Sequence, residues 1–76
     1  MAWREEGQAL VRDFEFQDFA GAMRFVNKVA ELAELQGHHP DILVHGWNQV
    51  RLTLSTHTSG TITDLDRALA DEIDGL

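Results

Sequence analysis

Residues 48–57 read Asn-Gln-Val-Arg-Leu-Thr-Leu-Ser-Thr-His, the most regular alternation of apolar and polar side chains in the chain. In an extended strand the two kinds of side chain point to opposite faces: Val50, Leu52 and Leu54 to one, Arg51, Thr53, Ser55 and His57 to the other. Such a strand packs its apolar face on a core and leaves the other face in water. The stretch therefore predicts a strand of a half-buried sheet.

Further strands are predicted on both sides of a central helix. Residues 41–45, Asp-Ile-Leu-Val-His, are rich in β-formers and join the first stretch around Gly46-Trp47, which predicts a hairpin. Residues 9–16 approximate another strand, although Arg12 interrupts its apolar face. That face contains Leu10, Phe14 and Phe16. Trp3 is a candidate for a short strand before it.

Two helices are predicted from their boundary residues. Asp18 is a suitable N-cap for a helix that runs to about Gln36, and Gly37 is a suitable stop. Its apolar stripe has the spacing of one helical face: Ala22, Phe25, Val26, Val29 and Ala33. After a loop at Ser59-Gly60, the stretch Thr63-Asp64-Leu65-Asp66 resembles a capping box and opens a second helix. Its expected apolar side is Leu65, Leu69, Ile73 and Leu76.

The element order is therefore ββαββα in a single domain spanning residues 1–76. We expect an α+β fold, with a four-stranded antiparallel sheet and both helices packed on one face. Edge strands of so small a sheet are open to a partner, and strand 48–57 is the expected pairing edge.

Charge and composition exclude several classes of function. The chain has six basic and thirteen acidic residues and a net charge of −7, whereas nucleic-acid binding leaves a basic footprint. No apolar run reaches the roughly 18 residues of a membrane span, and residues 1–6 have no signal-peptide core. We expect a soluble cytoplasmic protein without direct nucleic-acid or membrane partners. Since cysteine is absent, additional stability must come from idealised packing or from self-association, and we expect self-association.

Three histidines lie near the ends of predicted elements. His38 and His39 are adjacent after the first helix, and His57 ends the best strand. Glu34 lies four residues before His38, and Asp66 lies nine residues after His57. Imidazole titrates near neutral pH, and a neighbouring carboxylate fixes its tautomer and favours its charged form. Side chains of these types are suited to acid–base chemistry if the fold brings them together.

Each of these residues also has a purely structural explanation. Adjacent histidines after a helix are usually solvated, Glu34 is a plausible surface residue, and Asp66 fits the capping box. His57 at a strand end could serve packing. His45 has no carboxylate at a suggestive spacing and is expected at the surface or in the hairpin, and Trp47 is expected in the core or in an interface.

The complete spacing resembles the signature of the pterin-4a-carbinolamine dehydratase family. The chain reads Glu-x-x-x-His-His-Pro from Glu34, followed at family intervals by Trp47, His57 and Asp66. The surrounding residues agree over nearly the whole chain: Phe16-x-Asp18-Phe19-x-x-Ala22, and Thr56-His57 followed by Gly60-x-Ile62-Thr63-x-x-Asp66-x-x-Leu69-Ala70.

The resemblance implies a hydro-lyase that removes water from a 4a-hydroxytetrahydropterin in tetrahydrobiopterin recycling, with no cofactor and no metal. It implies a pterin site lined by His38, His39, Pro40, Thr56, His57 and Thr58. The predicted catalytic set is His38, His57, His39 and Glu34, and Asp66 is the orienting carboxylate. Within this set we assign acid–base chemistry to His38 and His57 and substrate binding to His39. Pro40 keeps His39 extended, so the neighbouring rings diverge and serve different roles.

Two alternatives stay open at this point. The first is a metal site, although adjacent histidines chelate poorly and zinc ligands are usually two to five residues apart. The second is a non-catalytic interaction or assembly module on the same fold, as in some relatives. The complete histidine set favours the enzyme.

Two departures from the family pattern concern the loop and the oligomer. Thr61 stands where relatives commonly have a second glycine, so the loop near the substrate is expected to differ in shape from theirs. Many relatives begin with an extra helix that is not found in these 76 residues. The resemblance implies a homodimer or homotetramer, with the higher state left open.

Overall fold

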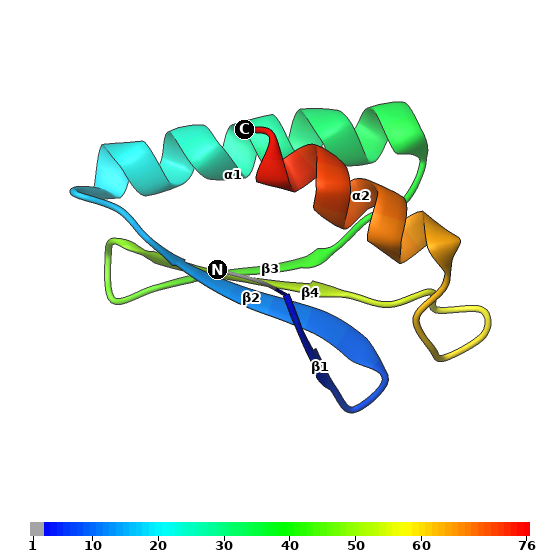
Figure 1. Ribbon diagram of the computed structural model, residues 1–76. Coiled ribbons are helices and arrows are strands. Elements are labelled where there is room, and N and C mark those ends of the chain that lie inside the picture. Colours follow the sequence, from blue (N-terminus) through cyan, green and yellow to red (C-terminus); the bar gives the residue numbers. More distant parts are fainter. Residues whose placement is uncertain (1–2) are drawn as a thin grey trace.

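The computed structural model describes residues 3–76, which form six elements in the order ββαββα (Figure 1). The strands are β1 (Arg4–Glu6), β2 (Ala9–Glu15), β3 (Asp41–His45) and β4 (Gln49–Leu54), and the helices are α1 (Phe19–Gln36) and α2 (Asp64–Asp74). The strands form one antiparallel sheet in the order β1-β2-β4-β3, and both helices cover the same face (Figure 1). The predicted α+β class is confirmed.

Strand β4 lies inside the sheet, between β2 and β3. The three apolar side chains that point to the helices, Val50, Leu52 and Leu54, are fully buried, as predicted. The prediction that this strand offers a pairing edge is wrong, because both of its sides are already hydrogen-bonded within the sheet. The open edges belong to β1 and β3.

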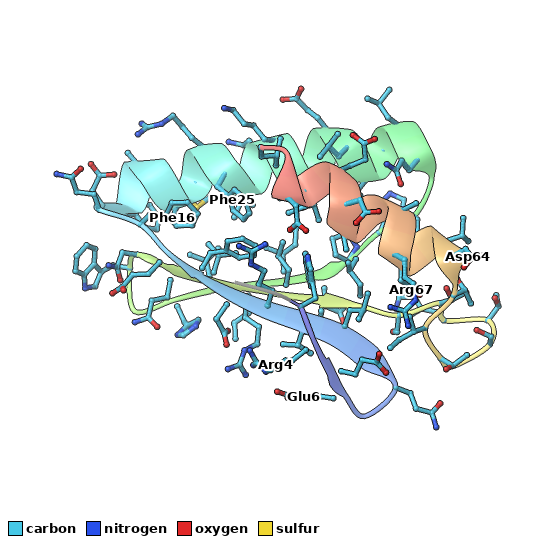
Figure 2. All side chains as sticks on the ribbon, in the orientation of Figure 1. Arg4, Glu6, Phe16, Phe25, Asp64 and Arg67 are labelled. Atoms are coloured by element: carbon cyan, nitrogen blue, oxygen red, sulfur yellow. The ribbon has the colours of Figure 1, made fainter. Side chains whose placement is uncertain are left out.

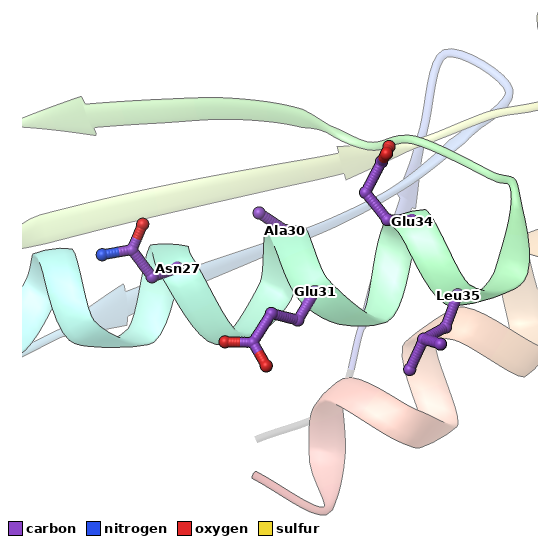
Figure 3. A pocket seen from close by; sticks show the side chains of 5 residues that line it. All are labelled: Asn27, Ala30, Glu31, Glu34 and Leu35. Carbon is purple, nitrogen blue, oxygen red and sulfur yellow. The ribbon is translucent and has the colours of Figure 1, made fainter.

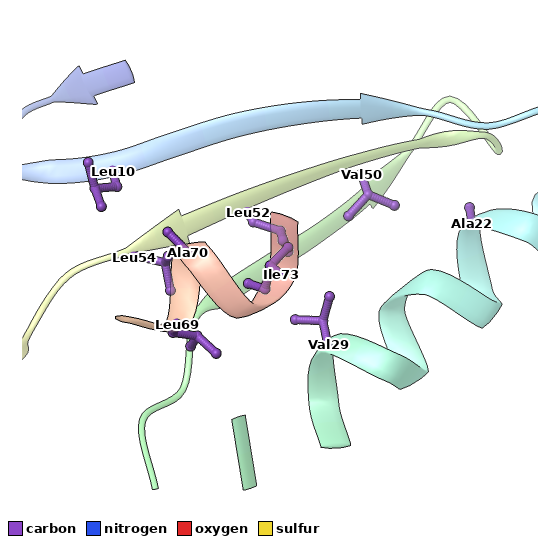
Figure 4. Packing of buried hydrophobic residues seen from close by; sticks show 9 residues of the cluster. All are labelled: Leu10, Ala22, Val29, Val50, Leu52, Leu54, Leu69, Ala70 and Ile73. Carbon is purple, nitrogen blue, oxygen red and sulfur yellow. The ribbon is translucent and has the colours of Figure 1, made fainter. Parts of the chain in front are cut away.

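The hydrophobic core lies between the sheet and the two helices (Figure 4). Leu10 comes from β2, Val29 from α1, and Leu69 from α2. The predicted apolar side of the second helix is only half correct, because Leu65 and Leu76 are 54% and 51% exposed. Leu65 lies in the first turn of α2 and Leu76 lies beyond its end, so neither reaches the sheet.

Arg12, which interrupts the apolar face of β2, has a structural role. Its Nη1 donates to Asp74 Oδ1 at 2.5 Å, and its guanidinium lies 4.6 Å from the ring centroid of Phe14. The indole Nε1 of Trp3 donates to the same carboxylate oxygen at 3.0 Å. These bonds connect the C-terminal end of α2 to the sheet.

The sheet face that points away from the helices carries ion pairs. Arg4 and Glu6 of β1 lie on this face (Figure 2). Asp13 accepts bonds from Arg51 Nε at 2.7 Å and from Arg4 Nη2 at 2.9 Å. This uncovered face therefore carries a network of charged side chains, and Leu43 of β3, paired with Arg51, lies exposed on the same face.

Local signals set the limits of α1. Asp18 Oδ1 accepts the backbone N–H of Gly21 at 2.7 Å, and Gly37 ends the helix with φ 64°. Both predictions are confirmed.

Two aromatic rings extend the buried layer beyond the core described above: Phe16 and Phe25 pack between α1 and the sheet, with ring centroids 5.0 Å apart (Figure 2). Within residues 3–76, neither helix has the length and apolar character required to cross a membrane.

Candidate active site

The chain turns sharply after α1 and presents the two adjacent histidines to different elements. Gly37 takes the left-handed conformation, and the backbone N–H of His38 donates to Ala33 O at 3.1 Å. The ring of His38 then contacts Asp66 of α2, whereas the ring of His39 contacts Glu34 of α1. The predicted divergence of the two rings is confirmed.

Asp66 is the buried centre of this site, with a relative exposure of 0%. Its Oδ1 bonds His38 Nε2 at 2.5 Å. Its Oδ2 accepts the backbone N–H of Thr63 and the hydroxyl of Thr56, each at 2.9 Å. Burial by itself raises the pKa of this carboxyl, but the bonds from His38, Thr63 and Thr56 outweigh burial and lower the pKa below its ordinary value. The carboxylate is therefore ionised at neutral pH.

The second histidine–carboxylate pair lies at the surface. His39 Nε2 hydrogen-bonds Glu34 Oε2, and the two side chains are 61% and 76% exposed. Water screens such a pair, so it adds little to the stability of the fold. The bond directs the His39 ring to α1, away from Asp66 of α2.

His57 lies in a turn after β4, and not at a strand end as predicted. Strand β4 stops at Leu54, and an isolated bridge between Thr56 and Thr61 closes the turn. Thr56 N donates to Thr61 O at 2.9 Å, and Gly60 takes a φ of 67°. Gly60 supplies the left-handed residue of this turn, and Thr61 does not have a positive φ.

These elements surround one hollow of about 260 Å³. It is lined by Gly37, His38, His39, Thr56, His57, Thr58 and Leu65. The three predicted histidines and two predicted threonines are thus brought together from segments far apart in the chain. Pro40 and Glu34 are outside the lining, and Asp66 is buried behind His38.

A larger hollow of about 650 Å³ lies along the outer face of α1 (Figure 3). It is lined by Asn27, Ala30, Glu31, Glu34 and Leu35. All of these come from one helix, and none is a histidine. The smaller hollow is therefore the candidate active site, because three histidines, a residue type used in acid–base catalysis, line it.

Sequence reasoning missed three residues of this site, of which Gly37 was expected only as the end of α1. Thr63 was expected only as a helix cap, but its hydroxyl also bonds the hydroxyl of Thr56 at 2.6 Å. Leu65 was assigned to the core, but it forms an apolar wall of the hollow. Thr63 could have been found from its place three residues before Asp66. Nothing in the helical period distinguishes Leu65.

The site pairs His38 and His39 with separate carboxylates. Within residues 3–76, no three His, Asp or Glu side chains are grouped closely enough to hold a metal ion. The fold and site together define a small α+β protein whose hollow is lined by histidines, threonines and one leucine.

The comparisons identify the family. All 76 residues match the family model described as pterin 4 alpha carbinolamine dehydratase, and the chain belongs to this family. The chain is 52% identical over 75 residues to a protein of Acidobacterium capsulatum named as a candidate pterin-4-alpha-carbinolamine dehydratase, covering 99% of this chain and 80% of that protein. A protein of Thermomicrobium roseum with the same name is 52% identical over 71 residues, covering 93% and 75% of the two chains.

Two solved structures are similar to this fold. One is described as a transcriptional coactivator/pterin dehydratase from Brucella melitensis, with a TM-score of 0.90, 33% identity, and coverage of 97% of this chain and 80% of that chain. The other is described as a pterin dehydratase-like protein that is a RuBisCO assembly factor in the alpha-carboxysome. Its TM-score is 0.82 and its identity 32%, and the match covers 99% of this chain and 88% of that one.

Proposed function

We propose that this protein is a 4a-hydroxytetrahydropterin dehydratase, a hydro-lyase that forms quinonoid dihydropterin and water. The observation that carries the proposal is the convergence of His38, His39 and His57 on one hollow, with His38 held by a buried carboxylate. Membership in the family supports the choice of a pterin as substrate.

The reaction needs one proton delivered and one removed. The hydroxyl on C4a leaves as water once it is protonated, and the C4a–O bond breaks. The N5–H proton is removed, and its electrons form the C4a=N5 double bond. Two histidines of opposite protonation state perform this exchange, since an imidazole pKa near neutrality suits both directions of transfer. His38 and His57 are the proposed acid–base pair.

The remaining residues of the site bind and orient. We assign His39, held by Glu34, to binding the pterin, with Pro40, Thr56 and Thr58 as further contacts implied by the family. Asp66 orients His38 from behind. We propose a cytoplasmic role in tetrahydrobiopterin recycling, without a cofactor.

The direct test measures the decay of a freshly formed 4a-hydroxytetrahydropterin by stopped-flow absorbance. We expect micromolar wild-type protein to accelerate the decay in proportion to its concentration. The matched control is the same amount of a His57→Ala variant. Decay at the buffer rate with folded wild-type protein would contradict the proposal.

Metal removal is a separate prediction. Exhaustive chelation should leave the dehydration rate and the melting temperature unchanged, because His38 and His39 are each paired with a carboxylate and no three-ligand group is found in residues 3–76. Stoichiometric zinc in the purified protein, with activity lost on its removal, would refute this prediction.

A second candidate is a non-catalytic assembly module. It is favoured by the solved relative described as a RuBisCO assembly factor and by Leu35 on the outer face of α1, which is 83% exposed. A scaffold has no need of a histidine-lined hollow, so the enzyme is the better-supported proposal. The stopped-flow assay also discriminates between the two.

A further inference from the structure

The hydroxyl groups of two threonines form a directed chain behind the candidate site. Thr56 Oγ1 lies 2.9 Å from Asp66 Oδ2 and 2.6 Å from Thr63 Oγ1. An ionised carboxylate can only accept hydrogen bonds, so the single hydroxyl proton of Thr56 goes to Asp66. Thr63 must then donate its own proton to Thr56. The chain therefore runs from Thr63 through Thr56 to Asp66.

This chain of hydrogen bonds immobilises the carboxylate of Asp66, which contacts His38. Asp66 Oδ2 receives two donors, the Thr56 hydroxyl and the Thr63 backbone N–H. The remaining oxygen, Oδ1, is then turned to His38 Nε2 at 2.5 Å. Because the carboxylate only accepts, the proton between these two atoms belongs to Nε2. In the neutral ring the free lone pair is then on Nδ1.

We propose that Thr63 and Thr56 are positioning residues, which act through Asp66 to hold His38 with its proton on Nε2 and leave Nδ1 as the atom that exchanges a proton in the hollow. The role of Nδ1 rests on the proposed dehydratase function. The hydrogen-bond chain and the tautomer do not. The family resemblance assigns Thr56 to substrate contact, whereas here its hydroxyl proton is committed to Asp66.

The alternative is that these bonds only start helix α2. Asp66 Oδ2 does satisfy the N–H of the N-cap residue, so a structural contribution is present. A structural role alone predicts that removing the Thr56 hydroxyl lowers stability and leaves the His38 ring unaffected. A positioning role predicts a change at the ring itself. The two roles are therefore separable by measurements on His38.

The experiment compares wild type with Thr56→Val, Thr56→Ser and Thr53→Val by ¹⁵N and ¹H NMR of labelled histidine. At a pH where the His38 ring is neutral, wild type should show a slowly exchanging Nε2–H signal from His38, with the ¹⁵N shift of Nδ1 typical of an unprotonated nitrogen. Thr56→Val should lose the slow exchange and shift towards a mixture of tautomers, and Thr56→Ser should restore both. Thr53→Val is the matched control, because Thr53 lies on the far face of β4, opposite Val11.

The kinetic readout separates positioning from substrate contact. Thr56→Val should lower kcat by roughly 10- to 100-fold with little change in KM, the scale seen when a group that orients a metal-ligating histidine is removed. A raised KM with unchanged kcat would assign Thr56 to substrate binding and overturn the positioning role. If Thr56→Val does not fold, Thr63→Val is measured in the same way.

The NMR outcome stands independently of the proposed function. If wild-type His38 has its proton on Nδ1, or if the hydroxyl-free variants keep the wild-type ring signals, the inference is wrong even in an active enzyme. If the ring signals change as expected but the wild type never accelerates the dehydration, the chain that orients His38 is established and the dehydratase assignment fails.

Discussion

At the scale of single residues, His57 offers the cleanest test of the chemistry. It is exposed in the turn after β4 and contributes nothing to the core, so His57→Ala should stay folded. We expect its turnover to fall by roughly 10²- to 10⁴-fold, as for a lost general acid–base group. Circular dichroism checks the fold, and stopped-flow absorbance checks the rate. A folded variant that turns over at the wild-type rate would remove His57 from the mechanism.

His38→Ala is a less clean variant than the sequence suggested. Its side chain is only 11% exposed and contacts Asp66, and its removal leaves a buried carboxylate oxygen without this partner. The free energy of unfolding should fall by about 1–3 kcal/mol in addition to the loss of activity. Activity must therefore be compared at a temperature where both proteins are folded.

The Asp66 carboxylate makes stability depend on acid pH. Its pKa is lowered in the folded state below the ordinary 3.8, so its contribution is fully present above about pH 4 and is lost as pH falls through the folded-state pKa. Urea unfolding between pH 3 and pH 7 measures this slope. Asp66→Asn should flatten the slope and lower stability at pH 7 by about 1–3 kcal/mol, because its amide cannot accept every donor.

Asp13→Asn is the matched control for this prediction. Arg51 and Arg4 also lower the pKa of the Asp13 carboxyl, but its side chain is 40% exposed and water screens the pair. We expect a smaller change in the pH dependence of stability than for Asp66→Asn. An equal change in the two variants would contradict the expectation that a buried carboxylate contributes more to the pH dependence of stability than an exposed one.

At the scale of elements, Gly37 controls the end of α1 and the direction of the chain into His38. Its φ of 64° is unfavourable for any residue with a Cβ atom, although the space around it is open. Gly37→Ala should lower the free energy of unfolding by about 1 kcal/mol and reduce dehydratase activity. Urea unfolding with a parallel rate assay measures both.

Gly75 supplies a control for Gly37 at the end of the other helix. Its φ is −86°, a conformation open to any residue, and an added Cβ atom would lie 3.5 Å from Glu72 O, an ordinary contact. Gly75→Ala should therefore change stability little. If Gly37→Ala and Gly75→Ala lower the free energy of unfolding equally, backbone conformation is not the reason that glycine is needed after α1.

The elements that could be predicted are those with local signals. Asp18 and Gly37 set the limits of α1 through bonds to residues three or four positions away, so the sequence pattern alone located them. The place of β4 inside the sheet depends on pairing with β2, far away in the chain, and no local pattern contains that information. The strand also ended early, because the bridge from Thr56 to Thr61 forms a turn where alternation predicted more strand.

In the candidate site too, the sequence pattern located single residues but not the contacts that depend on tertiary structure. The histidines and their carboxylates were identified from spacing that resembles a family, and the contact of His38 with Asp66 spans 28 positions. The Thr56–Thr63 bond was not predicted, because hydroxyl groups so common in loops carry no signal until the tertiary structure brings them together.

At the scale of the whole molecule, we predict self-association through β3. This edge strand leaves backbone groups unpaired, and Ile42 and Leu43 are 37% and 52% exposed. The other edge, β1, has only three residues and carries charged side chains that discourage pairing. Light scattering should give a mass well above 8.6 kDa, and the melting temperature should rise with protein concentration.

Two lysine substitutions locate the interface. Leu43→Lys should dissociate the assembly, since an edge lysine opposes strand pairing. Leu35→Lys, on the outer face of α1, should leave a β3 dimer intact. Dissociation by Leu35→Lys alone would place the interface on the helix, and a wild-type monomer with a concentration-independent melt would refute self-association.

The double use of Asp66 has an evolutionary consequence. A carboxylate that starts α2 is under selection for folding whether or not the chain performs chemistry, so in a lineage that abandoned catalysis it would be among the last residues to drift. Glu34 and His39 are exposed, and folding does not depend on their contact in the same way. After a loss of function, substitutions are therefore expected at Glu34 and His39 before they are expected at Asp66. Among relatives of this fold, loss of Glu34 and His39 would therefore indicate loss of the proposed activity, whereas retention of Asp66 would not indicate that the activity is kept.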